Sequence, residues 1–176
     1  EAYTEFWAET MNALFCSFFS LKNKRNIGEF LSHAEFFMNF ERTYSFFQLV
    51  KTLNFMGLSY QDLYSSTGRS RMLRDNLYKE KTNVLAYYII KTILINNYQD
   101  FLFWCKKNNF SLLKFNKTLA NQREFCAFIE HKYKRLGMLT AIAETRRFIG
   151  SMGNKTTSPK LNYILSNMRM SICELG

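Results

Sequence analysis

The chain contains a single proline, Pro159, and only seven glycines among its 176 residues. Sheet proteins need many turns, and turns depend on these two residue types, whereas long helices need neither. Apolar residues also recur at steps of three and four through most of the sequence, as on the buried side of a helix. We therefore predict an all-α fold, an irregular and mainly antiparallel bundle of about seven to nine helices, with at least about 60% helix.

The length is that of one domain, and hydrophobic residues make up 47% of the chain, so material for a core is ample. We predict a single helical domain over residues 1–176, which could also be the C-terminal part of a larger protein. Lys, Asn, Phe, Tyr and Ile are abundant, as is typical of coding from an AT-rich genome, for which a virus is one source.

The first predicted helix runs from Tyr3 to Leu21 and carries Glu1, Glu5 and Glu9 one turn apart, which indicates a solvated side. A second helical block spans residues 28–56 and ends at Gly57. The block is either continuous or interrupted, and the capping-box spacing of Ser32 and Glu35 marks Ser32 as the place where a helix would restart. The side chains predicted to face inward are Phe36, Phe37, Phe40, Phe46, Phe47, Val50, Leu53 and Phe55.

The remaining blocks are shorter. We predict a connector with one helical turn over residues 58–70. A helix that is broken near Thr82 is predicted over residues 71–96, and a short helix over residues 97–109. A short strand is expected within 110–118, followed by helices over 119–136 and 138–150 with Gly137 between them. A loop over 150–159 precedes a last helix, capped by Ser158, that runs to about Glu174. Because Phe47 and Phe103 lie in dense aromatic runs, we predict both to be buried.

The four cysteines lie mostly between apolar neighbours, at spacings that fit no common metal motif: Cys16, Cys105, Cys126 and Cys173. We predict free thiols that bind no metal, the first three of them buried, in an intracellular protein of the cytoplasm or of a virion. The longest apolar run, residues 84–95, is too short to span a bilayer and contains Lys91, so no transmembrane segment is expected.

Groups for catalysis are scarce. The chain has two histidines, and it lacks the GxxxxGK, GxGxxG and HExxH motifs. His33 and Glu35 match the HxE of zinc-dependent deaminases, but the PCxxC that completes that metal site is missing. We predict no catalytic residue, no metal site and no cofactor, which favours a protein that is not an enzyme.

The opening pattern ExxTExWAE resembles the helix that supplies the third zinc ligand, a glutamate, in gluzincin-type metallopeptidases. In that family the other two ligands come from an HExxH helix that precedes it, and this chain contains no such motif. The resemblance implies that Glu1 or Glu5 was once a ligand and that the chain is the helical C-terminal remainder of a zinc metallopeptidase.

A formal net charge of +10 at pH 7 suits nucleic acid, anionic membranes or acidic proteins as partners. Basic residues cluster near the expected helix ends, where they are candidates for binding nucleic acid or other anions, with Tyr44, Tyr60 or Tyr64 available for stacking. These candidates are Lys22, Lys24, Arg25, Arg69, Arg71, Arg74, Lys132, Lys134 and Arg135. The sequence does not tell whether these clusters share one face.

The leading interpretation is a non-enzymatic helical interaction or scaffold domain, because core material is plentiful and catalytic groups are scarce. Under this interpretation the main expected partner is another protein, and the chain could also form a homo-oligomer. Binding of RNA or DNA through the basic clusters is the first alternative. The remainder of a metallopeptidase is the second.

Overall fold

The computed structural model describes residues 1–152 and 159–172. The chain is 76% helical, and the described residues form eight α-helices and no strand, which confirms the predicted all-α fold. The helices are α1 (Ala2–Ser20), α2 (Ile27–Met56), α3 (Gly68–Leu77), α4 (Val84–Asn96), α5 (Tyr98–Asn108), α6 (Leu119–Lys132), α7 (Leu136–Met152) and α8 (Pro159–Ser166). The 3-10 turn η1 (Tyr60–Leu63) is the helical turn expected in the first connector.

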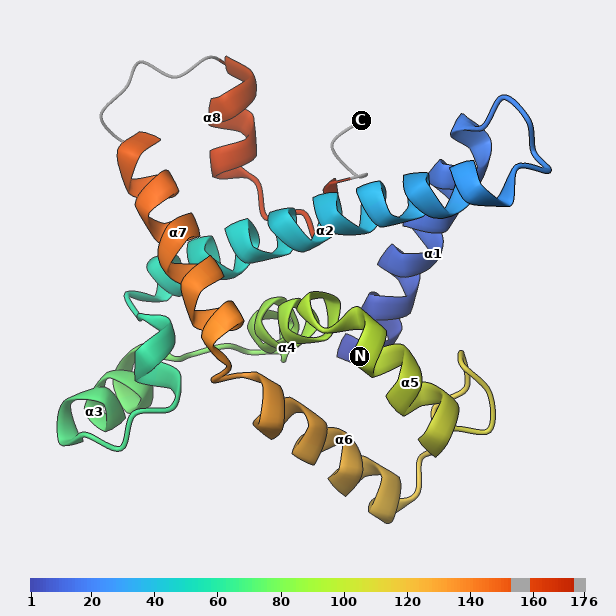
Figure 1. Cartoon of the computed structure of the whole chain (residues 1–176). Helices are drawn as coiled ribbons and strands as arrows, with labels where there is room; N and C mark the ends of the chain where they lie inside the picture. Colours follow the sequence, from blue (N-terminus) through green and yellow to red (C-terminus); the bar gives the residue numbers. More distant parts are fainter. Residues whose placement is uncertain (153–158, 173–176) are drawn as a thin grey trace.

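The long helix α2 crosses the whole molecule, and most other helices are arranged around it (Figure 1). Helix α1 packs against α2 and α4, while α7 crosses the C-terminal part of α2. Helix α3 lies at one extreme of the molecule and the turn between α1 and α2 at the other. The helices cross at wide angles, so the bundle is irregular, as expected.

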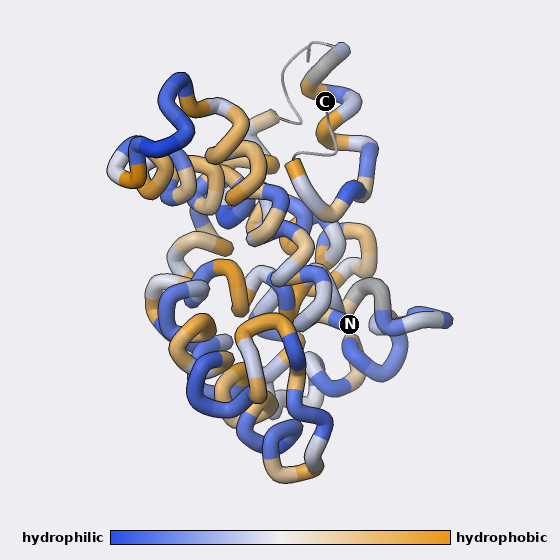
Figure 2. The backbone as a smooth tube through the Cα atoms, turned by 90° about the vertical axis from the view of Figure 1, so that its right-hand side faces the viewer, coloured by the Kyte–Doolittle hydropathy of each residue, from blue (hydrophilic) through white to orange (hydrophobic). Residues whose placement is uncertain are grey.

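Two apolar clusters form the core. One joins α2, α4 and α7 through Leu49, Leu53, Ile93 and Met138. The other joins α1, α4 and α5 and is built around Phe6 and Phe101. Hydrophobic and hydrophilic stretches alternate along the helices, as the amphipathic pattern of the sequence predicts (Figure 2).

Helix α2 is continuous, which is one of the two predicted alternatives, and no helix restarts at Ser32. The cap lies earlier, because the side chain of Asn26 accepts a hydrogen bond from the backbone N–H of Glu29 at 3.1 Å. The predicted end at Gly57 is confirmed, since this residue adopts the left-handed conformation with φ of 72° that favours glycine.

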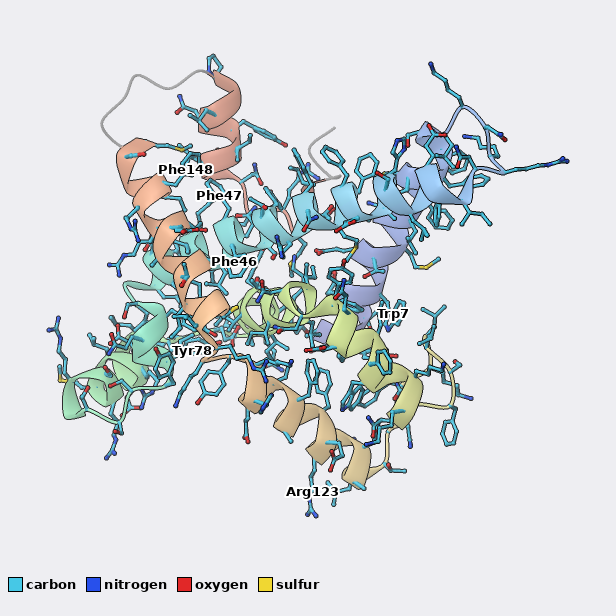
Figure 3. The ribbon with its side chains drawn as sticks, in the orientation of Figure 1. Trp7, Phe46, Phe47, Tyr78, Arg123 and Phe148 are labelled. Atoms are coloured by element: carbon cyan, nitrogen blue, oxygen red, sulfur yellow. The ribbon has the colours of Figure 1, made fainter. Side chains whose placement is uncertain are left out.

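Several predicted inward-facing rings of α2 are exposed, namely Phe36, Phe40 and Phe55. Phe46 and Phe47 are buried as predicted, and both lie on the part of α2 that α7 and α8 approach (Figure 3). Phe103 of α5, also predicted to be buried, is exposed as well. A spacing of three and four identifies a helix, but it does not tell which of two apolar sides the neighbouring helices cover.

The later elements differ from prediction in three places. Residues 110–118 contain only an isolated bridge between Ser111 and Lys114 instead of a strand. Helix α6 ends at Lys132 and α7 begins at Leu136, so Gly137 lies inside α7. The last helix begins at Pro159, as predicted, but ends at Ser166. The expected cap Ser158 and the expected end at Glu174 lie outside the described residues.

Three of the cysteines are free thiols, as predicted, while Cys173 lies outside the described residues. Only Cys105 is buried, and burial raises the pKa of its thiol to about 11. Cys16 is half-buried and Cys126 is exposed, so the predicted burial of these two is wrong. No described helix combines the length and the apolar character that crossing a bilayer requires.

Candidate functional site

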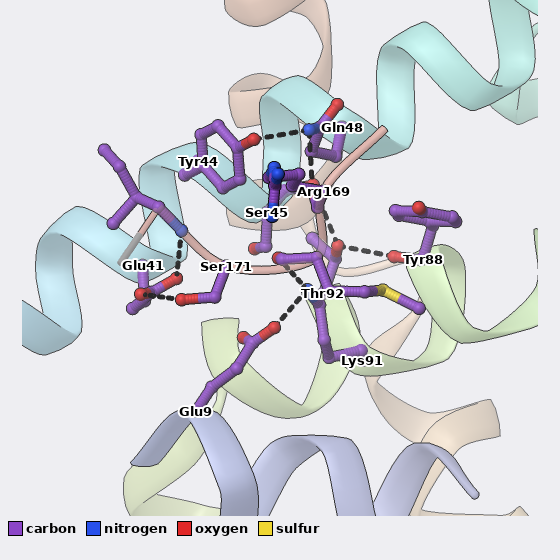
Figure 4. A network of polar contacts seen from close by, with 12 residues as sticks. Glu9, Glu41, Tyr44, Ser45, Gln48, Tyr88, Lys91, Thr92, Arg169 and Ser171 are labelled. Atoms are coloured by element: carbon purple, nitrogen blue, oxygen red, sulfur yellow. Dashed lines mark hydrogen bonds and ion pairs between the residues drawn. The ribbon is translucent and has the colours of Figure 1, made fainter. Parts of the chain in front are cut away.

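The segment 167–172, which follows α8, lies against α2 and α4 and is held there by polar side chains, most of which are buried (Figure 4). We call this stretch the C-terminal segment. The side chains that hold it form what we call the polar clamp, namely Glu41, Gln48 and Lys51 of α2 and Tyr88 and Lys91 of α4.

Four consecutive backbone carbonyls of the C-terminal segment each accept a hydrogen bond from the clamp. Lys51 Nζ donates to the carbonyl oxygen of Asn167 and the Tyr88 hydroxyl donates to that of Met168. Gln48 Nε2 donates to the carbonyl oxygen of residue 169 at 2.7 Å, and Lys91 Nζ to that of residue 170 at 2.6 Å. These four hydrogen bonds of the clamp therefore go to the backbone of the segment.

Glu41 provides the acceptors at the end of the segment. The hydroxyl of Ser171 donates to Oε1 of Glu41 at 2.6 Å, and the backbone N–H of Ile172 donates to Oε2 at 3.2 Å. The side chain of Glu41 is almost completely buried. The clamp thus donates to four carbonyls of the segment and accepts hydrogen bonds from Ser171 and Ile172 at its end.

The α2 part of the clamp comes from one stripe of the helix. Glu41, Tyr44, Gln48 and Lys51 follow one another at steps of three, four and three, which places them on one side. Tyr44 belongs to this stripe, because its hydroxyl accepts a hydrogen bond from Gln48 Nε2 at 2.6 Å and donates to Asn167 Oδ1 at 3.3 Å. This polar stripe inside an apolar block was the sequence signal that could have predicted the site.

Lys91 is fully buried and links the clamp to α1. Its Nζ lies 2.5 Å from Oε1 of Glu9, whose side chain is also buried. The prediction that Glu9 belongs to a solvated side is therefore wrong, while Glu1 is exposed and Glu5 half-buried. In the sequence, Lys91 is recognisable only as a charged residue that interrupts the apolar run 84–95.

The environment of Glu9 favours its protonated form. Burial raises the pKa of Glu9 to about 8, although Lys91 acts in the opposite direction and Glu41 and Glu5 add smaller upward contributions. Among the described residues no donor contacts the second carboxyl oxygen of Glu9. Burial also lowers the pKa of Lys51 to about 8.

The C-terminal segment is held mainly by these polar contacts. Within the described chain, neither buried apolar cluster includes a residue of α8 or of the segment. Buried polar groups are costly unless they are hydrogen-bonded, so an extended chain in the clamp lowers that cost by supplying their partners.

The predicted basic clusters lie far apart. Lys22, Lys24 and Arg25 form the turn between α1 and α2, whereas Arg69, Arg71 and Arg74 belong to α3 at the other end of the molecule (Figure 1). Two of these six side chains, those of Lys24 and Arg74, donate hydrogen bonds to backbone carbonyls of the chain itself. Lys24 Nζ donates to three backbone carbonyls at the end of α1, and Arg74 donates to the carbonyls of Asp62 and Ser65.

The third cluster lies where α6 meets α7. Lys132 is buried and paired with Asp100, and this contact holds the pKa of Asp100 below its usual range. Lys134 Nζ lies 4.9 Å from the ring centre of Tyr64. Arg135 contacts His131. Of the tyrosines expected to be available for stacking, Tyr44 and Tyr60 are buried.

The structure brings together two arginines that the sequence did not connect. Arg69 of α3 and Arg146 of α7 line the same polar hollow of about 770 Å³. Asp62 lines it too, and hydrogen bonds from Ser59 hold the pKa of Asp62 below its usual range. Arg146 also lines an adjoining cavity of about 600 Å³ together with Arg147 and Tyr64.

Within residues 1–152 and 159–172, no group of three or more His, Cys, Asp or Glu side chains is arranged to hold a metal ion. The clamp with its bound segment is the candidate site that we consider further. Comparison with models of protein families, with curated proteins and with solved structures finds no match to this chain.

Proposed function

We propose that the chain is a protein-interaction domain that holds an extended polypeptide segment between α2 and α4. Its own C-terminal segment occupies the site in the isolated chain, and a segment of a partner protein replaces it in a complex. The observation that supports this proposal is the run of four consecutive carbonyls, 167–170, that each accept a side-chain hydrogen bond.

Recognition through the main chain is a common way to bind extended peptides, because every peptide offers the same carbonyl groups. A clamp of this kind accepts different sequences, provided that their side chains fit. Each hydrogen bond contributes a net free energy of about 0.5–1.5 kcal/mol to binding. Several of them together therefore hold a segment and still allow another segment to replace it.

A peptide with the sequence of residues 164–172, ILSNMRMSI, tests the proposal by fluorescence polarisation. Asn167→Ala and Ser171→Ala together remove side chains that fix the chain's own segment, but they leave the clamp intact. We expect the labelled peptide to bind this loosened full-length chain with saturation. Tyr88→Phe in the same background should weaken binding about two- to tenfold, because one donor is lost.

Tyr87→Phe is the matched control, since Tyr87 is the neighbour of Tyr88 on α4 and its hydroxyl interacts with Glu1 instead of the segment. It should leave the affinity for the peptide unchanged. Failure of the peptide to bind a loosened chain that still melts cooperatively would refute the proposal. So would equal losses from the two tyrosine replacements.

We propose single-stranded nucleic acid as a second candidate ligand, bound along the surface between α3 and α7. The support is that Arg69, Arg146 and Arg147 line adjoining hollows and that Lys134 lies over Tyr64, which lines one of them. Cations beside an aromatic ring suit a phosphate backbone with stacked bases. The carboxylate of Asp62 opposes phosphate binding in the same hollow.

The salt dependence of binding tests this second candidate. Each neutralised phosphate contributes about −0.7 to the slope of log K against log salt for single strands. A true binding surface should give a slope worth several phosphates, and Arg69→Ala with Arg146→Ala should weaken binding much more than Lys22→Ala with Arg25→Ala. Equal effects of the two pairs would indicate only diffuse attraction to a basic protein.

A further inference from the structure

The end of the α1–α2 hairpin exposes a group of large apolar side chains. Phe19 and Ile27 are each 72% exposed, and three further members are exposed to lesser degrees. The full group, which we call the apolar tip, is Phe15, Phe18, Phe19, Ile27 and Leu31. The tip lies at one extreme of the molecule, away from α3 and α7 (Figure 1). Large exposed apolar side chains that gather at one end of a molecule mark candidate sites of interaction.

The tip is held in shape by local hydrogen bonds. Lys24 Nζ donates to the carbonyls of Phe18, Phe19 and Leu21, and it lies 5.1 Å from the ring centre of Phe18. The Ser20 hydroxyl and Nδ1 of His33 are 2.7 Å apart, which joins the two helices just behind the turn. The exposed rings are therefore presented on a fixed scaffold.

Charge around the tip is predominantly positive. Lys22, Lys24 and Arg25 are exposed within the turn itself. The nearest acidic residue in the sequence, Glu29, accepts a hydrogen bond from the side chain of Asn26, which caps α2. Exposed rings next to lysine and arginine complement a surface that has an apolar layer beneath anionic groups.

We propose that the apolar tip docks on an anionic lipid surface. The rings enter the boundary between headgroups and acyl chains, and Lys22 and Arg25 contact the headgroups. Peripheral proteins bind membranes through this combination of buried apolar area and attraction to anionic lipids. An apolar groove on a protein would satisfy the flanking cations only if its rim were acidic, whereas an anionic bilayer offers an apolar layer and negative charge together, so the charge pattern favours the lipid surface.

Co-sedimentation of the full chain with vesicles tests the proposal. We expect binding to phosphatidylcholine vesicles that contain phosphatidylserine, little binding to pure phosphatidylcholine, and weaker binding as salt is raised. Phe19→Ala with Ile27→Ala should weaken binding at least about tenfold, because both side chains lose their apolar contact. Lys22→Glu with Arg25→Glu should weaken it at least about tenfold as well.

Matched controls lie at the other end of α2. Phe55→Ala with Phe148→Ala removes two exposed rings there, and Arg69→Glu with Arg71→Glu reverses two exposed charges (Figure 3 shows Phe148). Neither pair should change vesicle binding by more than about twofold. Three results would overturn the proposal: no binding to anionic vesicles, equal losses from tip and control pairs, or self-association in ultracentrifugation that depends on Phe19 and Ile27.

Discussion

Replacement of Lys91 by methionine should lower the free energy of unfolding by about 3–5 kcal/mol at pH 8. The side chain is fully buried between Glu9 and the carbonyl of residue 170, so its loss leaves a buried carboxyl group and a buried carbonyl without their donor. Chemical denaturation followed by circular dichroism measures this change. Lys107→Met, at an exposed position of α5, should stay within about 0.5 kcal/mol of the unchanged chain.

The cost of Lys91→Met should be smaller at pH 5. The pKa of Glu9 is raised from 4.5 to about 8 in the folded chain, so the stability linked to its protonation is fully present below about pH 4.5 and is lost as the pH rises through 8. Without Lys91, that pKa rises further, and the carboxyl group stays neutral at pH 5. The loss of unfolding free energy that remains at pH 5 measures the contribution of the hydrogen bond from Lys91 to the carbonyl of residue 170.

The double variant Glu9→Gln with Lys91→Met separates the two contributions. Glutamine carries no charge, so the double variant should be more stable than Lys91→Met alone at pH 8 and should lose the dependence on pH between 5 and 8 that Glu9 causes. Because the pKa of Glu9 is already about 8 in the unchanged chain, the losses at the two pH values should differ by less than about 1 kcal/mol, and a loss at pH 8 that is larger by several kcal/mol would contradict the raised pKa.

Replacement of Phe101 by alanine should destabilise the chain by about 3–5 kcal/mol. The ring is completely buried, and its centre lies 4.8 Å from that of Phe6 and 5.6 Å from that of Trp104. Its loss would leave a cavity among other large rings, which cannot collapse easily to fill it. Thermal and chemical denaturation measure the effect.

Phe103→Ala is the matched control for Phe101→Ala, because it removes the same ring two residues further along the same helix. Phe103 is 80% exposed, so the change in the free energy of unfolding should be within about 0.5 kcal/mol. Similar losses in the two variants would show that the arrangement of α5 against α1 and α6 is incorrect.

Local features of the sequence were enough to predict the class of fold and most helix ends. The scarcity of Pro and Gly and the three-and-four spacing of apolar residues predicted the helices, because backbone hydrogen bonds within a helix connect residues only four apart. Gly57 and Pro159 marked an end and a beginning for the same local reason, since each fixes a backbone conformation by itself. The basic turn at Lys22–Arg25 was also evident.

Only the tertiary structure decided which sides of the helices are covered and which polar groups meet. Glu9 has the spacing of a solvated residue, and it is buried because Lys91, 82 positions away, meets it in the core. Phe101 and Phe103 have the same chemistry and nearly the same neighbours in sequence, yet one is packed and the other exposed.

The clamp depends on contacts of the longest range, such as that of Lys51 with Asn167 across 116 positions. Contacts of this kind are set by how whole helices pack, because the burial of one side of α2 depends on α1, α4, α7 and the C-terminal segment together. Periodicity along a single helix identifies its sides, such as the polar stripe of α2, but it does not tell which neighbouring element covers each side.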